Sequence, residues 1–342
     1  MFVVKALEVF VLYIFRPLKA QWISRKHGIE MTVGQTEILT NLRFADDVLL
    51  FASNKHQMQK MMTELQAASA LHGLRMHPDK TKILTNDSRL SGGKLQIGGN
   101  DIDILHPDVS VRYLGRQICM TDLHEAEFCN RMRAAWACFT LHRKELTNKR
   151  YPIKNRLKLF EATVSATALY GCEAWTLKID QQKRLRTTQR KMLRTVLGAK
   201  RRVINNDGSS ETTGGEQEAQ DGGEETLLEP WPDFLRRTTR RVEDLLAAAK
   251  LEDWLTTWRR RQWKWAGRVV DSQTHKWSHA VLGWRPDLHG RHKGHRTRRR
   301  PCKRWEDSLA DFCKGLPGAV PWRELAKNKD AWNKLEDTFA KQ

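Results

Sequence analysis

The chain has no closely spaced cysteine pair and no long apolar run free of charge. Its six cysteines, at 119, 129, 138, 172, 302 and 313, show no Cys-x-x-Cys spacing. Reduced thiols of a nuclear or cytoplasmic protein therefore fit better than the disulfides of a secreted one. The apolar start, residues 1–18, carries Lys5, Glu8 and Arg16, which makes it a poor membrane span and a poor signal peptide. We expect a buried helix there and no membrane partner.

Acidic residues are scarce relative to basic ones. The 60 Lys and Arg residues stand against 40 Asp and Glu residues, so the formal net charge is +20 and the pI is near 9.9. A surplus of this size predicts a polyanionic partner, and the clustering of Arg and Lys favours nucleic acid. With 342 residues, 40% of them hydrophobic, the chain can form two or three domains with real cores.

Lys and Arg are absent between Val203 and Leu235, where the composition is acidic and rich in Gly and Ser. Such a segment buries too little apolar surface to offset the entropy of ordering, so we predict a disordered linker over 203–232. It separates residues 1–120 and 121–202 from a basic, tryptophan-rich C-terminal region, residues 233–342.

Two adjacent carboxylates, Asp46 and Asp47, lie inside the apolar run 42–52. Burying them without a positive partner would be costly. In a straight strand they would point to opposite faces, whereas at the tip of a tight hairpin both can face one cleft. Mg²⁺ takes one or two carboxylates plus substrate phosphates in polymerase sites, and two such ions stabilise phosphoryl transfer. The alternative is an ordinary solvated turn.

Apolar periodicity predicts an α+β fold. Residues 54–72 read as a helix with Asn54 as N-cap and Gly73 after its end. Short strands are expected at 83–84 and 95–97 and a strand pair over 109–118, and helices dominate from Thr121 onward. The predicted core-facing positions are Met58, Met61, Met62, Leu65, Ala68 and Leu71 in the first helix, then Phe128, Met132, Ala135, Trp136, Phe139, Leu157, Phe160, Val164, Leu169, Leu185, Met192, Leu193, Val196, Leu197, Val242, Leu245, Leu246, Ala249, Leu251, Trp254, Leu255 and Trp258.

Five sequence blocks in one order resemble the reverse transcriptase of non-LTR (LINE-type) retrotransposons. They are Leu42-Arg43-Phe44-Ala45-Asp46-Asp47, Gly73-Leu74-Arg75-Met76-His77-Pro78-Asp79-Lys80-Thr81-Lys82, Tyr113-Leu114-Gly115, Tyr170-Gly171-Cys172-Glu173-Ala174-Trp175 and Arg298-Arg299-Arg300-Pro301-Cys302-Lys303-Arg304-Trp305. The resemblance implies the C-terminal part of a polymerase palm over 1–120 and a helical thumb over 121–202.

The resemblance also implies roles for individual residues. Asp46 would be the main ligand of two Mg²⁺ (or Mn²⁺) ions, with Asp47 as a secondary ligand. Lys80, or alternatively Lys82, would lie near the incoming triphosphate. The segment Tyr113, Leu114 and Gly115 would grip the primer end, and the implied partners are an RNA template and a DNA primer.

The sequence departs from the family pattern ahead of Asp46. The family has a further palm aspartate well upstream, whereas the acids before Asp46 here are Glu8, Glu30 and Glu37. The usual asparagine of the second block is His77. We therefore expect a C-terminal portion of a reverse transcriptase, without fingers and inactive on its own, for which the missing N-terminal half would be a partner.

Basic and aromatic residues in the second half of the chain are candidates for nucleic-acid binding. They are Lys191, Arg194, Arg259, Arg260, Arg261, Trp263, Trp265, Arg298, Arg299, Arg300, Lys303 and Arg304. For Trp263 and Trp265, interleaved with cations, we expect base stacking. The alternatives are a solvated helix face for Lys191 and Arg194 and a nuclear localisation signal for the run 291–304. Histidines 275, 279, 289, 292 and 295 lie near Cys302 and Cys313, but without a tight cysteine pair we expect no zinc site.

Three hypotheses follow from the sequence. The first is a fragment of an RNA-directed DNA polymerase, and the second is a non-enzymatic basic remnant that only binds nucleic acid. The third is an unstable pseudogene product.

Overall fold

The computed structural model describes residues 2–33, 35–204, 210–211, 227–271, 277–284 and 303–342. The chain divides into two compact units. The first comprises residues Met1–Glu127 and Arg268–Cys302, and the second comprises Phe128–Gly267 and Lys303–Gln342. The expected thumb-like region and most of the expected C-terminal region thus belong to one unit. None of the described helices is both long enough and apolar enough to cross a bilayer.

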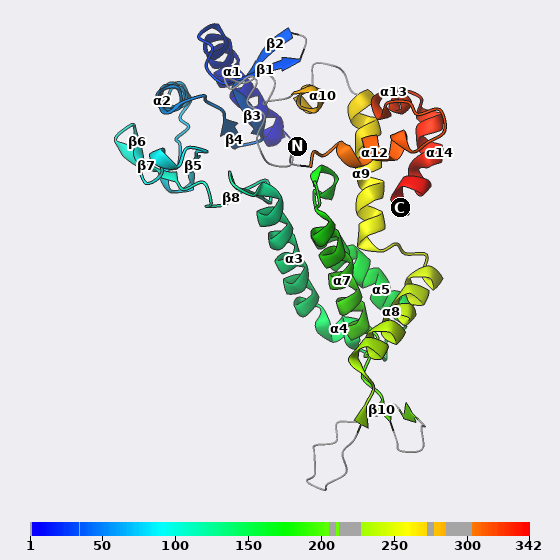
Figure 1. Cartoon of the computed structure of the whole chain (residues 1–342). Helices are drawn as coiled ribbons and strands as arrows, with labels where there is room; N and C mark the ends of the chain where they lie inside the picture. The colour runs from blue at the N-terminus through cyan, green and yellow to red at the C-terminus, as the bar shows by residue number, and fades with distance from the viewer. Residues whose placement is uncertain (1, 34, 205–209, 212–226, 272–276, 285–302) are drawn as a thin grey trace. The chain divides into compact units, whose positions relative to one another are not determined.

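The first unit combines helices with small sheets, which confirms the predicted α+β class (Figure 1). Helix α1 (Phe2–Ser24) is followed by the antiparallel ribbon β1 (Ile29–Val33) and β2 (Gln35–Leu39), and α10 (Trp277–Gly283) contacts β1. The ribbon β3 (Asn41–Phe44) and β4 (Asp47–Leu50) leads into α2 (Lys55–Ala70). A three-stranded sheet follows, in which β7 (Asn100–Leu105) pairs parallel with β5 (Ile83–Leu84) and antiparallel with β6 (Lys94–Ile97). The unit's last ribbon is β8 (Val111–Tyr113) with β9 (Arg116–Ile118).

Helix α2 is buried on two sides, as its methionines show. Met61 packs with Trp22 and other residues of α1, whereas Met62 packs with Leu95 and Ile97 of the sheet. The predicted cap is confirmed, because the Asn54 side chain accepts a hydrogen bond from the Gln57 amide at 2.9 Å. The apolar stripe ends earlier than predicted.

Leu71 was expected in that stripe but is 85% exposed. It is the C-cap residue of α2, and Gly73, with φ +71, turns the chain away directly after it. The helical period therefore does not extend to this residue.

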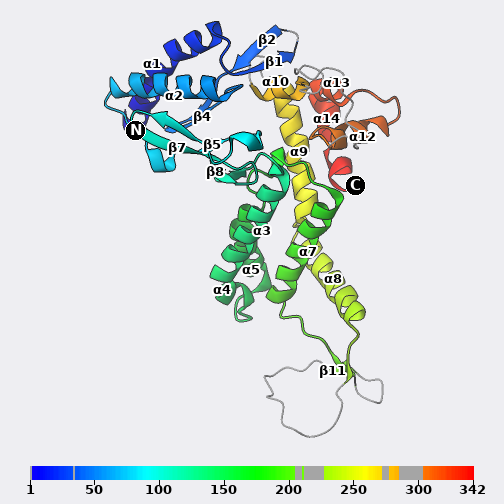
Figure 2. The ribbon, with the colours of Figure 1, turned by 60° about the vertical axis from the view of Figure 1, so that its left-hand side comes forward.

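The second unit is mainly helical (Figure 2), and most of its helices share one apolar core. Its first helices are α3 (Leu123–Leu141), which begins in the first unit, α4 (Arg143–Thr147), α5 (Ile153–Phe160) with a following π turn (Glu161–Ser165), α6 (Ala166–Ala168) and α7 (Ile179–Val196). Helix α8 (Trp231–Ala248) packs against α7, and α9 (Trp254–Asp271) carries the buried Trp254 and Trp258. The prediction that these two tryptophans are core residues is confirmed.

The C-terminal helices α12 (Asp307–Lys314), α13 (Trp322–Lys327) and α14 (Lys329–Ala340) complete the second unit. Phe312 of α12 and Phe339 of α14 pack against Trp263 of α9, with ring centroids 5.4 and 4.8 Å from its own. These helices and α9 therefore share a second aromatic core.

The predicted linker is ordered at both ends. Val203–Ile204 (β10) pairs antiparallel with Ser210–Glu211 (β11) and with Leu227–Leu228 (β12). Helix α8 begins at Trp231, inside the predicted linker range. Residues 205–209 and 212–226, where disorder was expected, lie outside the described part of the chain.

Candidate active site and nucleic-acid-binding residues

The two adjacent aspartates lie at the tip of a tight hairpin. Strands β3 and β4 pair with Phe44 opposite Asp47, so Ala45 and Asp46 form a two-residue turn. Ala45 takes a φ of +52°, in the left-handed region that is unfavourable for residues with a Cβ atom. Both aspartates are exposed. The predicted hairpin is thus confirmed, and the continuous helix or unbroken strand that would have argued against it is not observed.

Helix α1 supports this hairpin from one side. Val48 and Leu50 of β4 pack against the cluster formed by Phe15, Trp22 and neighbouring α1 residues. The Arg43 guanidinium lies 4.9 Å from the centre of the Phe15 ring, a cation–π distance. Because the strands rest on a packed helix, the two carboxylates project from a fixed base.

A second two-residue hairpin carries the Tyr-Leu-Gly segment. Strands β8 and β9 pair with Tyr113 opposite Arg116, and both turn residues have positive φ, +48° at Leu114 and +77° at Gly115. Positive φ at both positions is the signature of a type I′ hairpin turn. Burial raises the pKa of the Tyr113 phenol, and the negative charge of Asp47 raises it further. The two hairpins are therefore coupled electrostatically within one unit.

Lys80 ends a short 3-10 helix (Pro78–Lys80) that contacts β7, and Lys82 follows in the loop before β5. Both side chains are exposed. Among the described residues, no hydrogen bond or ion pair joins either lysine to Asp46 or Asp47. Their place near a triphosphate remains an expectation from the resemblance.

The described residues contain no group of three His, Cys, Asp or Glu side chains that could hold a metal ion. Asp46 and Asp47 alone offer the one or two carboxylates that Mg²⁺ takes when substrate phosphates supply the remaining oxygens. The pair thus fits a substrate-dependent magnesium site but does not form a complete protein cage. Of the histidines and cysteines weighed for zinc, His279 and Cys313 are described, and the others near them in sequence, including Cys302, lie outside the described residues.

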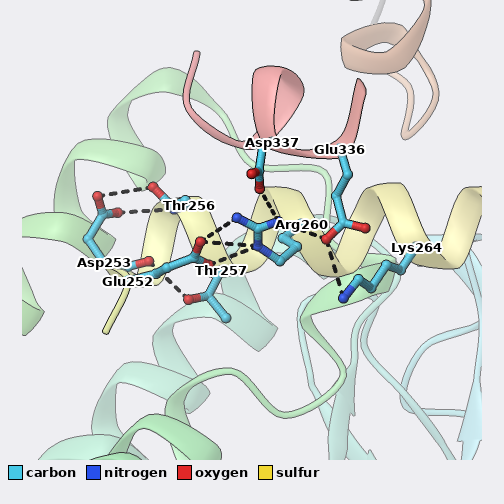
Figure 3. Close-up of polar contacts among 8 residues, drawn as sticks. All are labelled: Glu252, Asp253, Thr256, Thr257, Arg260, Lys264, Glu336 and Asp337. Carbon is cyan, nitrogen blue, oxygen red and sulfur yellow. Dashed lines mark hydrogen bonds and ion pairs between the residues drawn. The ribbon is translucent and has the colours of Figure 1, made fainter. Parts of the chain in front are cut away.

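The arginines of α9 point to partners within the second unit. Arg260 donates to Glu252 and meets Glu336 at 2.8 Å and Asp337 at 2.6 Å, and Lys264 also contacts Glu336 (Figure 3). These contacts raise the pKa of the Arg260 guanidinium. Three carboxylates of the same unit already neutralise its charge, which disfavours a contact with phosphate, and the role of Arg260 in nucleic-acid binding stays a prediction.

Arg259 and Arg261 flank this network. Arg259 donates to the backbone oxygen of Gln342, and burial lowers the pKa of its guanidinium. Arg261 donates to the backbone oxygen of Leu169 at 3.0 Å. Internal partners thus occupy donors of both side chains that were expected to face phosphate.

The structure contradicts base stacking by Trp263. Its side chain is fully buried, and its ring stacks on Trp332 with centroids 3.6 Å apart. No face is left for a nucleobase. Trp265 is partly buried in the same helix, and its stacking role remains a prediction.

The other residues predicted to bind nucleic acid have fewer contacts within the chain than Arg260 and Trp263. Lys191 is exposed and lies 5.6 Å from the centre of the Trp136 ring, whereas Arg194 is partly buried and donates to Thr239. Burial, and then the neighbouring Arg190, lower the pKa of Arg194. Lys303 is exposed, and Arg304 lies 3.6 Å from Glu306. Arg298, Arg299 and Arg300 lie outside the described residues.

Sequence reasoning did not single out the exposed basic residues of α4, the following loop and α5. These are Arg143, Lys144, Lys149, Arg150, Lys154 and Lys158. The signal was present in the sequence, because Glu145 is the one acid between residues 143 and 158. This basic signal was easy to overlook, because apolar core residues are interspersed with the cations in α5.

Comparison with known proteins identifies two similarities. Residues 6–118 match the family described as "Reverse transcriptase (RNA-dependent DNA polymerase)". The matched segment contains both hairpins and ends at the last residue of β9. A transposon-derived protein of Caenorhabditis elegans is 31% identical over 300 residues, which cover 86% of this chain and 94% of the relative.

Proposed function

Because the chain belongs to the retrotransposon reverse transcriptase family, we propose that Asp46 and Asp47 bind Mg²⁺ for RNA-directed DNA synthesis. The observation that carries the proposal is the exposure of both carboxylates at the tip of a two-residue turn that rests on α1. An ordinary solvated turn would need neither the packed base nor an alanine in the left-handed region.

In this proposal, Asp46 is the principal ligand and Asp47 the secondary one. The bound ions would stabilise the attacking and leaving oxygens of nucleotidyl transfer. The Tyr113 hairpin would position the primer end beside Asp47, which is consistent with the effect of Asp47 on the Tyr113 pKa. Lys80, or Lys82, would meet the triphosphate. The nucleic-acid partners would be an RNA template and a DNA primer.

We further propose that this chain does not polymerise alone. Two carboxylates leave the ions loosely fixed, and phosphoryl transfer requires reactants to be held in a near-attack geometry. A further carboxylate, from a segment or chain outside the described residues, would complete the site.

Two measurements on the whole chain test these proposals. In template-primer extension with Mg²⁺, we expect no synthesis, and robust synthesis that Asp46→Asn abolishes would overturn the proposed inactivity. In a titration with Mn²⁺ and an RNA–DNA hybrid, we expect paramagnetic broadening of the amide signals of residues 45–48. Asp46→Asn should remove the broadening.

The matched control is Asp103→Asn, which changes an exposed carboxylate on β7 of the same unit. Broadening that survives Asp46→Asn, or that Asp103→Asn removes equally, would contradict metal binding at the hairpin.

The second candidate function is a non-enzymatic nucleic-acid-binding protein, which the net charge of +20 favours. Its affinity should fall about 10³–10⁵-fold between about 50 and 200 mM salt if six to ten phosphate contacts form. If deletion of residues 291–305 leaves that salt dependence unchanged, this basic run is not the binder.

A further inference from the structure

Six exposed cations lie on α4, on the loop that follows it and on α5. They are Arg143, Lys144, Lys149, Arg150, Lys154 and Lys158, and they are called the basic corner below. Within the continuously described range 35–204 and the other described residues, none of the six forms an ion pair. Glu145 is the one acid in the same stretch of sequence.

The buried Arg156 side chain connects the segments that carry the basic corner. Nη1 of Arg156 donates to the backbone oxygens of Leu146 at 3.2 Å and Val196 at 2.7 Å, and Nε donates to that of Tyr151 at 3.2 Å. These carbonyls belong to the end of α4, the connecting loop and the last residue of α7. One side chain therefore fixes three segments relative to one another, and Figure 2 shows α4 and α5 adjacent in the bundle.

The position of Lys149 follows from the same arrangement. Its Cε atom lies 3.4 Å from the point where a Cβ atom on Gly198 would be, so its alkyl chain runs along the end of α7. Its ammonium nitrogen lies 3.8 Å from the same point, so this exposed cation sits beside the end of α7.

The basic corner differs from the arginine run of α9. Arg260 is neutralised by three carboxylates and is largely buried, whereas the corner cations are exposed and without ion pairs in the described residues. Like charges held together on a fixed surface repel one another, and this repulsion destabilises the folded state. Lys154 and Lys158, four residues apart on α5, are such a pair. A polyanion that binds the corner would offset that cost.

We propose that the basic corner binds the phosphodiester backbone of nucleic acid. This inference rests on the proposed function only in taking nucleic acid as the substrate class, and it is independent of the chemistry at Asp46 and Asp47. The contacts are to phosphate, so they fix position and carry no sequence preference.

The test replaces four corner cations in the whole chain with Lys149→Gln, Arg150→Gln, Lys154→Gln and Lys158→Gln. The matched control removes the same charge elsewhere in the second unit, with Arg240→Gln, Arg241→Gln, Lys250→Gln and Lys334→Gln. Those four side chains are also exposed and without ion pairs in the described residues. Each protein is titrated with a labelled RNA–DNA hybrid and with single-stranded RNA over a range of salt concentrations.

For the corner variant we expect an affinity loss of about tenfold or more. The slope of log affinity against log salt should become less steep by about 3 units, since each lost phosphate contact removes about 0.7–0.9. The control variant should lose clearly less. Equal losses in the two variants would overturn the proposal, because binding would then follow net charge alone. An unchanged slope in the corner variant would overturn it as well.

Two further controls keep the result interpretable. If the fourfold variant does not fold, the pair Lys154→Gln and Lys158→Gln replaces it, because removing a like-charged i,i+4 pair should not destabilise α5. Asp103→Asn, which changes an exposed carboxylate of the first unit outside the proposed metal site, should leave the affinity for the hybrid unchanged. If the corner variant loses affinity but Asp46 binds no metal, the proposed function is contradicted and the corner proposal stands. If Asp46 binds metal but the corner variant keeps its affinity, only the corner proposal is contradicted.

Discussion

Trp263 and Trp332 stack with ring planes 8° apart, and each indole N–H donates to the backbone carbonyl of the other residue. The two hydrogen bonds measure 3.0 and 3.2 Å, and both side chains are buried. The pair joins α9 to α14 across 69 residues of sequence. The close approach also requires Gly267, because a Cβ atom there would lie 2.9 Å from Nε1 of Trp332.

Replacing Trp332 with alanine should therefore destabilise the second unit. We expect the free energy of unfolding to fall by about 3–5 kcal/mol, because a large buried ring is lost and the Trp263 N–H is left next to a cavity. Urea unfolding followed by circular dichroism measures this loss. Trp231→Ala is the matched control, since Trp231 is 57% exposed, and its effect should stay below about 1 kcal/mol. Similar losses in both variants would contradict the assignment of Trp332 to the core.

Replacing Arg260 with methionine should leave Glu252, Glu336 and Asp337 close together without their shared cation. We expect a loss of about 1–3 kcal/mol in the free energy of unfolding, because the arginine is mostly buried and its hydrogen bonds are charge-assisted. Lys264→Met is the control. Its ammonium group meets Glu336 at 3.3 Å and is 56% exposed, so its loss should cost less than about 1 kcal/mol. Thermal unfolding of the two variants side by side checks this ranking.

Glu229 should make stability depend on acid pH. Hydrogen bonds from Arg237 lower the pKa of the Glu229 carboxyl from 4.5 to about 2 in the folded chain. Because the folded-state pKa is the lower one, the stabilisation is complete above the unfolded value and is lost as pH falls through the folded value. We expect Glu229→Gln to lower the free energy of unfolding by about 1–3 kcal/mol at neutral pH.

The difference between wild type and Glu229→Gln should shrink as the pH falls from 4.5 to about 2. Denaturant unfolding at a series of pH values measures it. Asp244→Asn changes an exposed carboxylate of α8 and should give no such pH-dependent difference. A difference that stays constant across this pH range would contradict the role of the ionised Glu229.

Ala45 tests whether the turn conformation at the aspartates is required. Ala45→Val places a β-branched residue at a φ of +52°, which should cost about 1–2 kcal/mol and disturb the hairpin. Ala45→Gly removes the Cβ strain, so it should leave the free energy of unfolding within about 1 kcal/mol of wild type. Amide chemical shifts of residues 41–50 report whether the hairpin persists. Equal tolerance of valine and glycine would show that the positive φ is not maintained.

Local patterns were sufficient where neighbouring residues in the sequence determine the structure. The Asn54 cap forms with Gln57, three residues away, and the Asp46 turn is bounded by two short strands that pair with each other. The Leu114-Gly115 turn is local in the same sense. Such interactions need no distant partner, so the sequence predicted both hairpins and most helices.

Distant partners determined the features that the sequence analysis missed. In the sequence, Trp263 and the arginines of α9 resemble a run that binds nucleic acid. In the structure, residues 332–342 cover the Trp263 ring and neutralise Arg260. Arg156 resembles the lysines around it in sequence, yet the end of α7, 40 residues later, makes it a buried structural residue.

The sequence by itself determined the family, the basic charge and the aspartate turn, because each depends on residue identity and short-range geometry. Only the tertiary structure decided which cations remain free to meet phosphate. A charge is available to a ligand only if folding leaves it exposed and brings no carboxylate to it, and that depends on helices far apart in the chain.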